Sequence, residues 1–110
     1  MTYRFRARGR HKPGVMNKLE AAYANHLEQE KRAGRIMWWA FESMKFKLAE
    51  KTFYSPDFIV MGNDGYLEGH EVKGFWEDDA RVKIKCAAEK FPIKFLGVKL
   101  LRGAWQFEEF

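Results

Sequence analysis

Two acidic residues and a lysine lie in two consecutive apolar segments of this chain. Asp57 begins one segment, and Glu71 and Lys73 lie in the next, two residues apart and so on one face of a strand. Two carboxylates can hold a hard divalent cation, and a neighbouring lysine can orient an attacking water molecule or offset charge in a transition state. Metal-dependent cleavage of a phosphodiester needs these residue types.

The two carboxylates can meet in one register of the predicted hairpin. Residues directly opposite in an antiparallel pair point to the same face. Asp57 lies opposite Glu71 if residues 63–65 form a three-residue loop, which favours a left-handed glycine at its end, as Gly65 provides. A two-residue turn would instead place Asp57 opposite Val72. The chemistry therefore predicts the three-residue loop, and ordinary surface charges on a hairpin are the alternative.

A helix with a third carboxylate precedes the hairpin. Apolar residues recur there in steps of three and four, at Met16, Leu19, Tyr23 and Leu27. This spacing predicts a helix over residues 15–32. Glu20 lies at the edge of this apolar stripe. It is either a solvated residue or a group directed at the boundary between helix and sheet.

The remaining elements complete an alternating pattern of helices and strands. After the first helix we expect strands at about 36–41, 44–49, 53–61 and 66–73, a helix at 78–90, a strand at 94–101 and a short strand near 105–107. This order predicts an α/β fold with a mixed β-sheet of four to five strands flanked by two helices.

Four segments in this order carry a resemblance to a known family. They are Lys18-Leu19-Glu20-Ala21, Lys45-Phe46-Lys47-Leu48, Asp57-Phe58 and Glu71-Val72-Lys73-Gly74, and together they span roughly residues 15 to 95. The set resembles the PD-(D/E)XK nuclease superfamily, and within it a group of small, resolvase-like phage and prophage proteins. That group often has glutamine and proline before its Lys-Phe strand, where this chain has Glu42-Ser43-Met44.

The resemblance implies a restriction-endonuclease-like core and a role for each matched residue. Asp57 and Glu71 would bind Mg²⁺, which Mn²⁺ can replace, with the Val72 carbonyl as a further ligand. Lys73 would assist the water or the transition-state charge, and Glu20 would complete the site through water or a second metal. Oxygen ligands suit these ions and argue against a structural zinc site.

Positive charge is concentrated at the N-terminus. The net charge is +5, and the first twelve residues contain five basic residues and no acid: Arg4, Arg6, Arg8, Arg10 and Lys12. Basic residues at every second position suit contacts with phosphates, and a solubilising tail is the alternative. We therefore expect a flexible basic arm over residues 1–14, followed by a single nuclease-like domain over 15–110.

More basic and aromatic residues follow the second site strand. Arg81, Lys83 and Lys85 lie on the predicted helix 78–90, where they either contact phosphates or form a solvated face. Phe75 and Trp76 directly precede that helix. They either stack on a base or pack in the core.

Composition excludes several other classes of protein. A single cysteine, Cys86, excludes an internal disulfide and fits a reducing, cytoplasmic compartment. No apolar stretch approaches the ~20 residues needed to span a bilayer, so we expect no membrane partner. His70 should face away from Glu71 and serve a structural role.

These observations predict a metal-dependent DNA endonuclease. A domain of this size makes few DNA contacts, which favours recognition of branched DNA or Holliday junctions over sequence readout, and a homodimer with one active site per cut strand. Two alternatives remain open. One is a catalytically silent nucleic-acid-binding protein in a phage replication or recombination complex, and the other is an inhibitor of a host enzyme.

Overall fold

The larger of two sheets forms the centre of the molecule. The computed structural model describes residues 3–4 and 14–110. In these residues the larger sheet has the order β2-β5-β6-β7-β8, with β6 and β7 parallel and the other neighbours antiparallel. The fold is therefore α/β with a mixed five-stranded sheet, as predicted. The strands are β2 (Ile36–Phe41), β5 (Phe58–Gly62), β6 (Leu67–Val72), β7 (Lys94–Leu101) and β8 (Ala104–Glu109).

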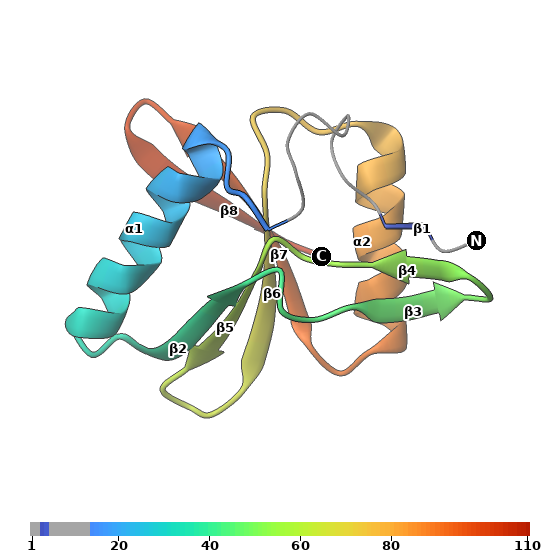
Figure 1. Cartoon of the computed structure of the whole chain (residues 1–110), viewed down its shortest axis with the longest axis horizontal. Coiled ribbons are helices and arrows are strands. Elements are labelled where there is room, and N and C mark those ends of the chain that lie inside the picture. The colour runs from blue at the N-terminus through green and yellow to red at the C-terminus, as the bar shows by residue number, and fades with distance from the viewer. Residues whose placement is uncertain (1–2, 5–13) are drawn as a thin grey trace.

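Two helices cover opposite faces of this sheet (Figure 1). They are α1 (Lys18–Arg32) and α2 (Asp78–Lys90). The α1 side chains pack in one apolar cluster with Phe58 and Val60, whereas α2 packs in a second cluster with Ile59. Neighbouring residues of a strand point to opposite faces, so the two helices lie on opposite sides of β5. In the described part of the chain, neither helix is long and apolar enough to cross a membrane.

The β5–β6 hairpin has the register that the chemistry predicted. Phe58 lies opposite His70, and the Gly62 N–H donates to the Tyr66 carbonyl at 3.1 Å. Gly65 has a φ of +84°, in the region that glycine tolerates best. The three-residue loop is thus confirmed. The same register places Asp57 and Glu71 opposite each other, one position beyond the Phe58–His70 pair.

The prediction of one continuous strand over 53–61 is wrong. The chain forms β4 (Thr52–Tyr54), leaves the sheet over residues 55–57, and then forms β5. Pro56 lies in this break, and a proline has no backbone N–H to contribute to a central strand.

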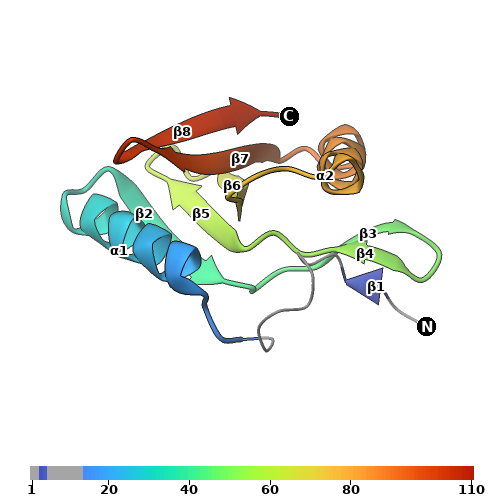
Figure 2. The same ribbon diagram turned by 90° about the horizontal axis from the view of Figure 1, so that it is seen from above.

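The smaller sheet therefore takes strands that were expected in the main one. It has the order β1-β4-β3, with β3 (Phe46–Ala49) antiparallel to β4 and β1 (Tyr3–Arg4) parallel to it. The β3–β4 hairpin lies beside α2 (Figure 2). The change of sheet at residues 55–57 places Asp57 at the junction of the two sheets.

The start of α1 is set by a capping box rather than by the apolar stripe. The Asn17 side chain accepts a bond from the Glu20 N–H at 2.8 Å, and the Glu20 carboxylate accepts one from the Asn17 N–H at 2.9 Å. The helix accordingly begins at residue 18 and not at 15. The start of α2 differs, because Glu77 precedes that helix and makes no side-chain capping bond.

Close packing at Gly69 should make this position intolerant of any side chain. A Cβ there would lie 2.8 Å from Phe95 Cδ1 and 3.1 Å from Pro56 Cγ, and Phe95 is fully buried. We expect Gly69→Ala to lower the free energy of unfolding by about 1–3 kcal/mol in urea denaturation. Gly74→Ala is the matched control, because no atom lies within 4 Å of its added Cβ. Equal stability of the two variants would contradict this packing.

Candidate active site

Three buried charged side chains meet where the chain passes from the smaller sheet to the larger. Asp57 directly precedes β5, Glu71 lies in β6, and Lys73 follows β6 directly. Their exposed fractions are 6%, 1% and 9%. Charged residues are seldom this buried unless they are paired, so the cluster is unusual for ordinary surface charges. The hairpin register therefore brings together the residues that the sequence singled out.

Hydrogen bonds hold both carboxylates in place. Lys73 Nζ lies 3.1 Å from Glu71 Oε2, and the Tyr54 hydroxyl donates to Glu71 Oε1 at 2.9 Å. Asp57 Oδ2 accepts a bond from the Val72 N–H at 2.9 Å. Tyr54 comes from β4, so the smaller sheet also contributes to the site. Asp57 is thus held by the backbone of β6, and Glu71 is held by Tyr54 of β4 and by Lys73.

The carboxylates of Asp57 and Glu71 are unfavourable as two negative charges, because both are buried and lie close together. Burial raises the pKa of Asp57 well above its usual range, and the charge of Glu71 raises it further. Burial also raises the pKa of Glu71, although Lys73 and the Tyr54 hydroxyl oppose this change. With both acids ionised, one lysine leaves an excess negative charge in a buried place. A cation or a proton would relieve it.

The structure buries Glu20 near these residues. Its exposed fraction is 3%, and its charge contributes to the raised pKa of Asp57. The solvated alternative for Glu20 is therefore wrong. The capping box holds its carboxylate at the start of α1, next to the Asn17 N–H. Glu20 belongs to the electrostatic environment of Asp57.

Tyr54 and Glu42 also take part in the site, although neither was predicted there. Tyr54 lies on a different strand from both acids, so no residue spacing could predict its bond to Glu71. The Glu42 N–H donates to the Asp57 carbonyl at 2.8 Å, and Glu42 has a φ of +50°. Its carboxylate accepts a bond from the Gly14 N–H at 2.9 Å. Glu42 thus positions the Asp57 backbone, and its left-handed conformation is visible only in the structure.

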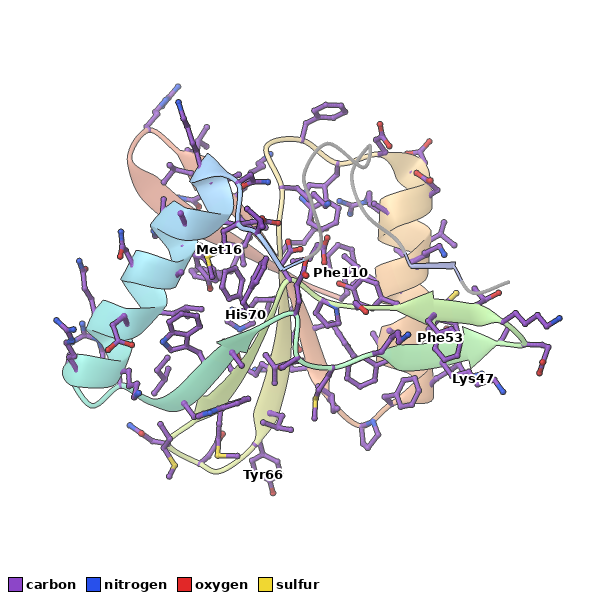
Figure 3. The ribbon with its side chains drawn as sticks, viewed as in Figure 1. Met16, Lys47, Phe53, Tyr66, His70 and Phe110 are labelled. Atoms are coloured by element: carbon purple, nitrogen blue, oxygen red, sulfur yellow. The ribbon has the colours of Figure 1, made fainter. Side chains whose placement is uncertain are left out.

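His70, which is labelled in Figure 3, lies on the α1 side of β6, the face opposite Glu71, as predicted. Its Nδ1 is 2.7 Å from the Tyr23 hydroxyl, and its Nε2 is 2.9 Å from Glu68 Oε1. Burial raises the pKa of Tyr23, so its hydroxyl stays protonated. His70 therefore links α1 to the sheet and is separate from the Asp57–Glu71 pair.

The basic residues predicted to contact phosphates have different surroundings. Arg81 is held by Glu108, with an Nη1–Oε1 distance of 3.1 Å, whereas Lys85 is exposed and Lys83 half-buried on α2. Arg4 lies in β1, whose backbone pairs with β4. The other basic residues of the N-terminal arm lie outside the described residues; they are Arg6, Arg8, Arg10 and Lys12.

No family model matches the sequence, no curated protein is similar to it, and no solved structure matches its fold. The functional interpretation therefore depends on the residues and geometry of this chain. Within residues 3–4 and 14–110, no three acidic, histidine or cysteine side chains are already grouped as metal ligands. The Asp57–Glu71 pair nevertheless suits a hard divalent ion, because its donors are carboxylate oxygens and its buried charge is in excess.

Proposed function

We propose that this protein is a metal-dependent DNA endonuclease with a restriction-endonuclease-like core. The observation that carries the proposal is the buried cluster of Asp57, Glu71 and Lys73 on one face of a hairpin, with two carboxylates and one cation. A protein that only binds nucleic acid gains nothing from paired acids near a phosphate. A hydrolytic site needs them to hold a metal ion.

The metal ligands would be the carboxylates of Asp57 and Glu71 and the carbonyl of Val72. Glu20 would complete the site through water or a second metal. Mg²⁺ is the proposed ion, and Mn²⁺ can replace it. When bound, the ion supplies Lewis-acid polarisation of a phosphoryl oxygen and lowers the pKa of a coordinated water.

The protein residues would position the substrate and balance its charge. Lys73, which lies 3.1 Å from Glu71, can orient the attacking water or offset the charge that develops on the phosphate. Tyr54 holds the other oxygen of Glu71, so the carboxylate keeps its orientation. Protonation of the leaving oxygen would come from solvent. Lys83, Lys85 and the basic arm would contact the DNA backbone.

The size of the molecule favours a structure-selective reaction. Its longest dimension is 41 Å and the other two are 30 and 23 Å. A surface of this size can contact only a short stretch of duplex, which limits direct base readout. We therefore propose branched DNA, such as a Holliday junction, as the substrate. A homodimer would place one active site on each cut strand.

Tyr54→Phe tests the positioning of Glu71. The variant removes the hydroxyl that donates to Glu71 Oε1 but keeps the buried ring. Loss of one supporting bond to a metal ligand typically costs about 10–100-fold in activity or metal affinity. We expect a fall of this size in the cleavage rate, measured at saturating Mg²⁺, with the native circular dichroism spectrum retained. An unchanged rate would show that Tyr54 does not orient the acid.

A panel of labelled DNAs tests the proposal as a whole. Single strands, duplex, flap, fork and four-way junction would be incubated with Mg²⁺, Mn²⁺ or EDTA. We expect cleavage that needs the metal and is fastest on branched DNA. Binding without cleavage under every condition would favour the catalytically silent binding protein instead. The absence of both binding and cleavage would leave the inhibitor hypothesis.

A further inference from the structure

An aromatic side chain projects into solvent two residues after the site lysine. Phe75 is 73% exposed, whereas its neighbour Trp76 packs in the apolar cluster beneath α2. The Trp76 ring lies 5.8 Å from that of Phe110 and packs against the backbone at Gly97. Of the two roles considered for this pair, core packing therefore applies to Trp76, whereas Phe75 lies outside the core. Anchoring of Trp76 fixes the point from which Phe75 projects.

The distance from the site limits what Phe75 can contact. Consecutive Cα atoms are 3.8 Å apart, so the Phe75 backbone lies within about 8 Å of that of Lys73. Bases along one strand follow each other at about 3.4 Å. A phosphate positioned by Lys73 would therefore have its neighbouring bases, one to three nucleotides away, within reach of Phe75.

The charges around Phe75 favour a base over the phosphate backbone. Glu77, Asp78 and Asp79 follow directly, and the two aspartates occupy the first turn of α2. Acids at this position repel phosphates, so this helix terminus is not a phosphate site. An uncharged aromatic face beside them can still stack on a base, which carries no net charge.

We propose that Phe75 stacks on an unpaired or unstacked base next to the scissile phosphate. This inference rests on the proposed nuclease function and names the feature of the substrate that the site selects. In a branched or forked DNA the base at the junction is already free of part of its stacking. Phe75 therefore gains a stacking partner there without the cost of opening a duplex. An intact duplex offers no such base.

The chain provides a matched control for this residue. Tyr66 is also an aromatic residue with 73% exposure, but it precedes β6 at the hairpin loop, whereas Phe75 follows the other end of that strand. Figure 3 shows Tyr66 projecting from the loop between β5 and β6. Removing either ring should leave the fold intact, so a difference between Phe75→Ala and Tyr66→Ala reports on contact with DNA.

The test measures binding in EDTA, where no cleavage is expected. The full chain would be titrated with a forked DNA, a four-way junction and a duplex, each with 2-aminopurine within three nucleotides of the junction or at the matching duplex position. We expect Phe75→Ala to weaken binding to the fork and junction by about tenfold or more, and to abolish the change in 2-aminopurine fluorescence. Phe75→Tyr should retain both signals, and duplex binding should not change.

Three outcomes would overturn the inference, and each differs from failure of the nuclease proposal. If the wild type binds the fork but Phe75→Ala binds it equally well, Phe75 does not stack on the DNA, whereas the endonuclease proposal stands. If Tyr66→Ala loses as much affinity as Phe75→Ala, the effect is not local to the site. If the wild type binds none of the DNAs in EDTA, the inference fails as well, and the cleavage assay with Mg²⁺ decides the endonuclease proposal separately.

Discussion

Replacing Asp57 by asparagine should abolish cleavage and at the same time stabilise the metal-free protein. The variant removes a proposed metal ligand, and loss of one charge-stabilising group typically costs at least about 10²–10³-fold in rate. Asparagine can still accept the bond from the Val72 N–H at the same position. It also removes one of two buried carboxylates that repel each other, so the free energy of unfolding should rise at pH 7 in EDTA.

The stability that Asp57→Asn gains over the wild type should increase with pH. The folded state raises the pKa of Asp57 above the usual value of about 3.9, so the native protein retains a proton that the unfolded chain releases. The contribution of Asp57 to stability is therefore fully present below pH ~3.9 and is lost as the pH rises through the folded pKa. Asp57→Asn does not titrate, so its advantage over the wild type should grow with pH.

Urea denaturation at several pH values in EDTA measures this difference. Asp64→Asn is the control, because Asp64 is an exposed acid of the β5–β6 loop and the substitution changes the net charge equally. Added Mg²⁺ should stabilise the wild type at high pH and leave Asp57→Asn unaffected. A variant that is less stable than the wild type at pH 7, by a margin that increases with pH, would contradict the description of Asp57 as a buried, repelled carboxylate.

Lys73→Met should cause the largest loss of stability among these variants. Lys73 and Glu71 form an ion pair whose side chains are 10% and 2% exposed. Removing one partner of a buried pair leaves the other charge uncompensated, which costs about 3–5 kcal/mol. We expect a loss of this size in the free energy of unfolding at pH 7. The loss should be smaller at acid pH, where Glu71 takes up a proton.

Two further variants separate the ion pair from general effects of the substitution. The double variant Glu71→Gln with Lys73→Met carries no buried charge at this pair, so it should recover much of the lost stability. Lys47→Met is the surface control, because Lys47 pairs with Glu50 at 3.6 Å with both side chains exposed. Such pairs are worth about 0–1 kcal/mol. Equal effects of Lys73→Met and Lys47→Met would contradict the buried pair.

Local patterns predicted much of this fold because they act over short distances. The spacing of apolar residues in α2 and the apolar runs of β2 and β7 predicted the first and last residues of these elements, and the structure confirms them. The register of the β5–β6 hairpin followed from Gly65 and from the chemistry of the two acids. In these cases the decisive interactions lie within one element or one turn.

The errors arose where distant parts of the chain decide the structure. The sequence around Pro56 reads as one β-strand, and only the pairing of β4 with β3 and β1 shows that the chain changes sheets there. The Tyr54–Glu71 bond depends on that change of sheet. Burial of Glu20 likewise depends on how α1 packs against the sheet. Its position at the edge of the apolar stripe does not show whether the side chain is buried or solvated.

Binding of Mn²⁺ to the wild type and to Asp57→Asn is the most direct test of the central claim, which is that Asp57 and Glu71 form a divalent-cation site. The electron paramagnetic resonance signal of free Mn²⁺ would be followed as protein is added, with Asp64→Asn as the charge-matched control. We predict binding by the wild type and by the control, competition by Mg²⁺, and affinity at least about tenfold weaker for Asp57→Asn. Equal Mn²⁺ affinity of all three proteins would contradict the account.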